Sequence, residues 1–138
     1  FVKDLNHFYL DNSPLWEIDN SWDGFQWLVH DDHSQSVVAF RRTDEAGEDI
    51  IAICNFTGNR REGYRMGAPQ QKDYEIAFSS DELKYGGSGM IQPEVIPAQS
   101  SPMHGKPFSI TVDIPPMSCL FLKAAKPAQV VLDAVIPD

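Results

Sequence analysis

The sequence predicts an all-β protein, an antiparallel β-sandwich preceded by one short N-terminal helix. About seven short apolar segments, β-branched or alternating in character, are separated by turns every 8–12 residues or so, which is typical of a sandwich. The 138 residues fit one domain, and 42% hydrophobic with 11% aromatic residues suffice for a buried core.

The first element is a helix within residues 1–13. Apolar residues recur there at helical spacing, at Val2, Leu5, Phe8 and Tyr9. No capping residue precedes them and the chain does not open with Met, so we expect a helix that has been truncated. Pro14 stops it, because proline cannot continue a helix and restrains the residue before it.

From Gly24 onward the pattern changes to period two. Phe25, Trp27 and Val29 alternate with the residues between them, which predicts a strand with Trp27 in the core. Residues 31–35 supply turn chemistry, and residues 36–42 form the second predicted strand.

The segment 50–56 is the most apolar strand, and it follows a polar acidic turn over residues 43–49. Both of its faces are apolar up to Cys54, which predicts a central strand buried on both sides. Cys54 and Cys119 both lie in apolar runs, where a free thiol packs as a small hydrophobic group. A disulfide between neighbouring strands remains an alternative.

The remaining strands are predicted over residues 63–66, 74–78, 108–114 and 118–123. Residues 85–107 are rich in glycine and proline, so we expect a long irregular loop there. The tail, residues 124–138, loses the strand pattern. Its apolar residues suit an extended segment docked on the domain.

The net charge of −9 excludes several classes of partner. An acidic surface repels phosphate backbones and anionic lipid, so we expect neither nucleic acid nor membrane to bind. No apolar run approaches the roughly 20 residues of a membrane span, and no signal peptide opens the chain. Nothing in the sequence suggests an oxidising compartment for its two cysteines, so we expect a cytoplasmic protein. We also expect that it needs no cofactor.

Two acidic clusters are candidates for catalysis or metal binding, namely Asp31-Asp32 and the turn from Asp44 to Asp49. Both fall in predicted hairpin turns, where solvated carboxylates are expected. His30 and His33 lack a third ligand at a recognisable spacing, and the acidic turn lacks the register of a calcium loop. We predict no catalytic residue and no metal site.

Several segments together resemble the end of the bacterial 1,4-α-glucan (glycogen) branching enzymes, a family of the α-amylase superfamily. The resemblance covers residues 1 to about 123 and rests on Asp4–Tyr9, Pro14–Trp16, Gly24–His33, Ser36–Arg42, Asn55–Thr57, Tyr85–Gly89 and Pro115–Met117.

The resemblance implies an enzyme with an N-terminal sandwich, a catalytic (β/α)₈ barrel and a C-terminal sandwich. Residues 1–13 would be the remainder of the last barrel helix, residues 14–123 the C-terminal sandwich, and Val2, Leu5, Phe8 and Tyr9 would face the barrel. The family's reaction cleaves an α-1,4 glucan and rejoins it at a 6-hydroxyl, using carboxylates on the barrel loops. None of those carboxylates has a counterpart here, so we expect an inactive domain.

Aromatic side chains are the remaining candidates for a site. Sugar rings stack on flat indoles, so Trp22 and Trp27 are candidate contacts to glucan or to the barrel. Trp22 lies in the turn-rich stretch 20–24, which favours exposure. The alternatives are an autonomous carbohydrate-binding module and the C-terminal domain of another α-amylase-superfamily enzyme.

Overall fold

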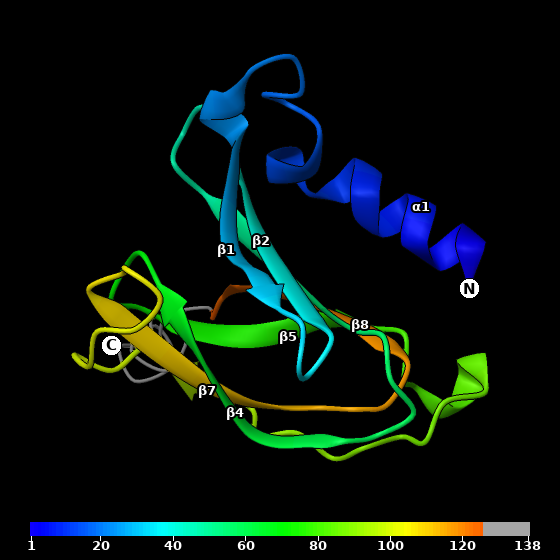
Figure 1. Ribbon diagram of the computed structural model, residues 1–138. Helices are drawn as coiled ribbons and strands as arrows, with labels where there is room; N and C mark the ends of the chain where they lie inside the picture. The colour runs from blue at the N-terminus through cyan, green and yellow to red at the C-terminus, as the bar shows by residue number, and fades with distance from the viewer. Residues whose placement is uncertain (126–138) are drawn as a thin grey trace, which may run out of the picture.

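Two antiparallel sheets form a sandwich in the computed structural model, which describes residues 1–125 (Figure 1). The larger sheet has the order β1-β2-β3-β8-β5-β6, and the smaller one pairs β4 with β7. The strands are β1 Phe25–Asp32, β2 Val37–Thr43, β3 Asp49–Asn55, β4 Arg61–Ala68, β5 Asp73–Ser79, β6 Ile96–Pro97, β7 Phe108–Ile114 and β8 Ser118–Ala124. The predicted all-β sandwich is confirmed, and each of the seven predicted strands is present.

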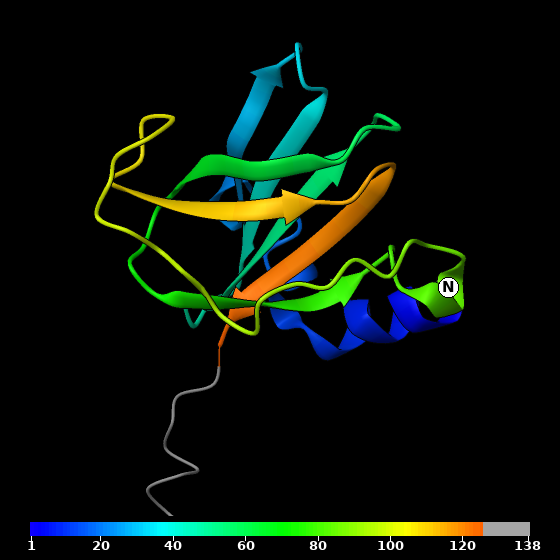
Figure 2. The same cartoon turned by 90° about the horizontal axis from the view of Figure 1, so that it is seen from below.

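The core lies between the two sheets, because alternate residues of each strand point inward. Ile53 of β3 and Leu120 of β8 meet Met66 of β4 and Ile110 of β7 there, and all four are fully buried. Figure 2 shows β4 and β7 running across the strands of the larger sheet. The larger sheet therefore has an inner face toward this core and an outer face on the opposite side.

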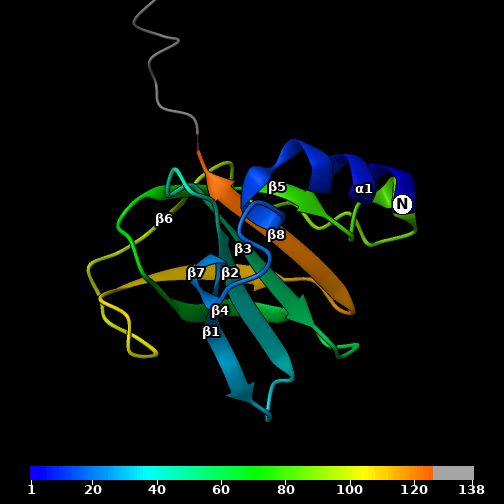
Figure 3. The same ribbon diagram turned by 90° about the horizontal axis from the view of Figure 1, so that it is seen from above.

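The N-terminal segment covers part of that outer face. Helix α1, Val2–Asp11, lies over β5 and β8 (Figures 1 and 3), where the ring of Phe8 packs against Phe78 and Phe121. The 3₁₀ turn Ser13–Leu15 follows and buries Pro14 and Leu15. Both faces of β3 are thereby covered, and the prediction of a doubly buried central strand is confirmed.

Trp27 is not in the core, and the predicted placement is wrong. A β-bulge interrupts the pairing of β1 with β2 between Trp27 and Val29. A bulge adds one residue to a strand and shifts its alternation. Leu28 and Val29 are consequently both buried, whereas Trp27 points outward and is 47% exposed.

The long loop is less irregular than predicted. It contains the short strand β6, which pairs with Asp73 and Tyr74 at the edge of the larger sheet. Of the predicted tail, the structure describes only Ala124, the last residue of β8, and Ala125, whose N–H donates to the carbonyl of Asp73. Residues 126–138 lie outside the described part of the chain, so the prediction that the tail docks on the domain is not tested there.

Candidate functional site

The outer face of the larger sheet carries a cluster of four rings that we call the aromatic platform: Trp22, Phe25, Trp27 and Phe40. Phe25 stacks on Phe40 with ring centroids 5.3 Å apart, and Trp27 meets Phe25 edge-on at 5.1 Å. Trp22 lies 6.1 Å from Phe25 and is 82% exposed. Its exposure agrees with the expectation from the turn-rich sequence around it. The two tryptophans predicted as candidate contacts are thus brought together through Phe25.

The loop that carries Trp22 is held in place by Arg42 of β2. The Arg42 guanidinium donates to the carbonyl of Gly24 at 3.1 Å and forms an ion pair with Asp19 at 2.9 Å. Gly24 is needed because a Cβ there would lie 2.2 Å from the carbonyl oxygen of Ile18. The position of Trp22 is therefore set by its sequence neighbours and by a strand residue distant in the chain.

A shallow cavity of about 340 Å³ lies between this loop and the sheet, lined by Trp22, Phe25 and Arg42 among others. An exposed indole next to a guanidinium and a carboxylate provides both stacking and hydrogen-bonding groups. A cavity with an apolar wall and a few polar groups suits one sugar ring.

The four helix residues predicted to face the barrel do not share one environment. Phe8 packs on the sheet of this domain, and Leu5 is half-buried beside it. Val2 is 66% exposed and Tyr9 is 42% exposed. Within the described residues, one edge of the apolar stripe rests on the outer face and the other edge is uncovered.

A second set of contacts fixes the start of the helix. The hydroxyl of Tyr85 donates to the carboxylate of Asp4 at 2.5 Å, and Lys84 lies 3.7 Å from the same carboxylate. The hydrogen bond from Tyr85 lowers the pKa of Asp4, and the same contact raises the pKa of Tyr85. Phe1 packs edge-on against Tyr85 at 5.0 Å. The sequence gave no sign that Asp4 and Tyr85 pair, because the contact depends on how the loop after β5 folds back.

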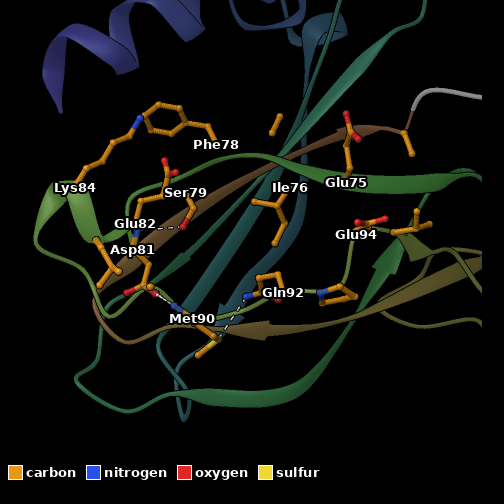
Figure 4. Close-up of a pocket in the computed structure, with 16 residues that line it drawn as sticks. Glu75, Ile76, Phe78, Ser79, Asp81, Glu82, Lys84, Met90, Gln92 and Glu94 are labelled. Carbon is orange, nitrogen blue, oxygen red and sulfur yellow. Dashed lines mark hydrogen bonds between the residues drawn. The ribbon is translucent and has the colours of Figure 1, made fainter.

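A groove of about 890 Å³ runs between β5 and the loop after it (Figure 4). At one end Asp81 accepts hydrogen bonds from the backbone of Ser88 and Met90 and from the Ser88 hydroxyl. Burial raises the pKa of Asp81, but the hydrogen bonds from Met90, Ser88 and Gly89 outweigh it and lower that pKa. The Asp81 carboxylate thereby organises the Tyr85–Gly89 loop, whereas the general acid of a glycosidic site has a raised pKa.

The acidic clusters weighed as catalytic or metal sites have structural partners. Asp32 accepts a 2.6 Å hydrogen bond from Tyr64, and Asp44 accepts one of the same length from Ser13. Asp49 is fully buried and pairs with Arg41 and Lys72, each at 2.8 Å. Over residues 1–125, His, Cys, Asp and Glu side chains form no group of three suited to a metal ion.

The described helices are all too short or too polar to cross a membrane.

Curated relatives of this chain are named 1,4-alpha-glucan branching enzyme GlgB. The protein of Halothermothrix orenii is 40% identical over 124 residues, which is 89% of this chain and 20% of the relative. The protein of Photobacterium profundum is 41% identical over 88% of this chain, and that of Geobacillus stearothermophilus 37% over 94%. The chain thus spans about a fifth of the length of these relatives.

The profile of one domain family matches residues 27–125, from the exposed tryptophan of β1 to the end of the described chain. The matched region contains strands β2 to β8 in full and all of β1 apart from its first two residues. Together with the sandwich topology, the match shows that this chain belongs to the family described as the α-amylase C-terminal all-β domain.

Proposed function

We propose that this chain is the C-terminal, non-catalytic domain of a 1,4-α-glucan branching enzyme, and that it stabilises the catalytic (β/α)₈ barrel. The parent enzyme would act in glycogen synthesis as a retaining glycosyltransferase, cleaving α-1,4 links and forming α-1,6 branches in the cytoplasm. The names of the relatives and the length matched in each support this assignment.

The observation that carries the proposal is the uncovered apolar surface on the outer face. The aromatic platform and the exposed edge of α1, with Val2 and Tyr9, lie on the same side of the larger sheet. Exposed apolar patches mark interaction sites, and inter-domain contacts within one chain cover roughly 600–1,500 Å². We assign this surface to the barrel, with α1 as the last barrel helix.

The interface is tested by Trp27→Asp in the full-length protein and in this domain alone. If Trp27 contacts the barrel, the full-length variant loses branching activity at a lower temperature than the wild type, whereas the unfolding temperature of the isolated domain changes little. Phe56→Asp is the matched control, since Phe56 is 61% exposed and lies outside the platform. Equal thermal inactivation of the wild type and Trp27→Asp would refute the assignment.

A second candidate function is a peripheral contact to α-glucan, favoured by the exposed indole of Trp22 beside Arg42 and Asp19. One sugar ring stacked on one indole supplies only a few kcal/mol of binding free energy, from which the entropy cost of ordering the sugar is subtracted. We therefore expect a dissociation constant in the millimolar range or weaker. Trp22→Ala should weaken retardation of the isolated domain in an amylopectin gel. Unchanged retardation in Trp22→Ala would remove this function and leave the barrel contact standing.

The domain alone should neither branch nor hydrolyse amylose. Incubation with amylose followed by iodine staining measures this directly. A reproducible change in the spectrum, absent from a mock purification, would contradict a non-catalytic role.

A further inference from the structure

We propose that Cys54 and Cys119 are a redox-active pair, which a hydroperoxide or an oxidised low-molecular-weight thiol converts to a disulfide between the two central strands. Whichever enzyme the domain belongs to, strands β3 and β8 place the only two cysteines of the chain opposite one another.

The first support is the register of β3 against β8. Cys54 lies directly opposite Cys119, between the pairs Ile53–Leu120 and Asn55–Ser118. Directly opposed residues of an antiparallel pair have Cα atoms roughly 4.5–5.5 Å apart. Disulfides span Cα separations of about 4.4–6.8 Å, so the backbone needs no rearrangement to admit the bond.

The second support is the position of the sulfur atoms themselves. The two Sγ atoms lie 2.8 Å apart, and both residues are free thiols. Both side chains point to the outer face and are half-buried, so a small oxidant has access to them.

The strands on both sides fix this geometry. Val38 of β2 pairs with Cys54, and the backbone N–H of Cys119 donates to the hydroxyl of Ser80 at 2.8 Å. The carbonyl of Cys119 accepts the N–H of Ser80 at 3.1 Å. Because β3 and β8 each have a neighbour on their far side, neither strand is free to move the thiols apart.

The contact also separates the roles of the two thiols. The hydrogen bond between the sulfurs lowers the pKa of Cys119 to about 7, while that bond and burial raise the pKa of Cys54. A lowered pKa gives Cys119 the larger thiolate fraction near neutral pH, and the thiolate is the attacking form in thiol oxidation. Cys54 retains its proton and acts as the resolving thiol.

The reaction balances with a hydroperoxide as the oxidant. The Cys119 thiolate attacks the peroxide oxygen, an S–O bond forms, the O–O bond breaks, and the leaving oxygen takes a proton as water or alcohol. Cys54 then attacks the sulfenic sulfur, the S–S bond forms, the S–O bond breaks, and water leaves with the proton of Cys54. Two thiols are oxidised and one peroxide is reduced.

The experiment oxidises the folded 138-residue chain, purified with reductant and then freed of it. Samples equilibrated with hydrogen peroxide or with a series of glutathione buffers are quenched in acid, alkylated and digested for mass spectrometry. We expect one linked peptide pair containing Cys54 and Cys119, no alkylated cysteine, and a monomer on a non-reducing gel. The bridge closes the segment from β4 to β7 into a loop, so the unfolding temperature should rise by roughly 5–15 °C on oxidation.

Cys54→Ser and Cys119→Ser are the matched controls, because each leaves one thiol and forms no intramolecular bridge. Their unfolding temperatures should not rise with oxidant, and glutathione buffers should yield mixed disulfides instead. If both thiols of the folded wild type can still be alkylated in the most oxidising glutathione buffer, the proposal is wrong. Linkage between different chains only, seen as a dimer, would overturn it equally. Circular dichroism of each reduced sample shows that folded protein is being compared.

Discussion

The ring of Phe8 in the N-terminal helix lies 5.5 Å from the ring of Phe121 in strand β8. Phe121 points to the outer face, while its neighbours Leu120 and Leu122 point into the core. Strand β8 therefore joins the core of the sandwich to the helix through alternate side chains.

This contact predicts that Phe8→Ala destabilises the domain. A buried phenylalanine contributes about 3–5 kcal/mol on truncation, and Phe8 is half-buried, so we expect a loss of about 1–2 kcal/mol in the free energy of unfolding. Urea unfolding followed by circular dichroism measures it. Leu10→Ala is the control, because Leu10 is 65% exposed and should change stability by less than about 0.5 kcal/mol. Equal stability of the two variants would show that the helix is not held by Phe8.

The buried carboxylate of Asp49 predicts a larger effect. Asp49→Asn removes the charge that balances Arg41 and Lys72, both of which lie mostly out of solvent. Breaking a buried ion pair by removing one partner costs about 3–5 kcal/mol, and we expect about 3 kcal/mol here because the cations retain some solvent contact. Glu48→Gln, an exposed neighbour, is the control in the same denaturation series. A loss below about 1 kcal/mol would mean that the cations find other partners.

The contact between Asp4 and Tyr85 predicts a pH dependence at both ends of the scale. The pKa of Asp4 is lowered from 3.8 in the folded chain. Its carboxylate therefore contributes to the free energy of unfolding above pH 3.8, and this contribution is lost as the pH falls through the lowered pKa. The pKa of Tyr85 is raised from 10.0 in the folded chain. Its protonated hydroxyl therefore contributes to the free energy of unfolding below pH 10.0, and this contribution is lost as the pH rises through the raised pKa.

Thermal unfolding of the wild type and Tyr85→Phe across the pH range tests this. The difference in unfolding temperature between the two should be largest near neutral pH and shrink at both extremes. A constant difference would show that packing of the ring, and not the hydrogen bond, is what Tyr85 contributes.

Gly24→Ala should rearrange the loop that carries Trp22. The new Cβ would lie 2.2 Å from a backbone oxygen, so the loop must move, at a cost of about 1–3 kcal/mol. A shift in tryptophan fluorescence together with lower stability is the expected result. Gly58→Ala is the control, because nothing lies within 4 Å of its Cβ position. Unchanged tryptophan fluorescence in Gly24→Ala would show that the conformation of this loop does not determine the environment of Trp22.

The strands were predictable because their periodicity is a local property of the sequence. The doubly buried β3 followed from the apolar run Ile50–Ile53, and the exposure of Trp22 followed from the polar residues around it. The placement of Trp27 failed because one inserted residue in β1 reverses the alternation, and a bulge leaves no mark in composition. The pairing of Asp4 with Tyr85 was equally invisible, since it joins two residues far apart in the sequence.

The position of β8 has a consequence for synthesis on the ribosome. Of the strands in residues 1–125 this one is synthesised last, yet it lies between β3 and β5 in the larger sheet. Until residues 118–124 emerge, β3 and β5 each present an unpaired edge, and such edges pair with other chains. The nascent domain therefore joins the two parts of its larger sheet in one late step. We expect chains stalled before residue 118 to aggregate or to be captured by chaperones, however complete their other strands are.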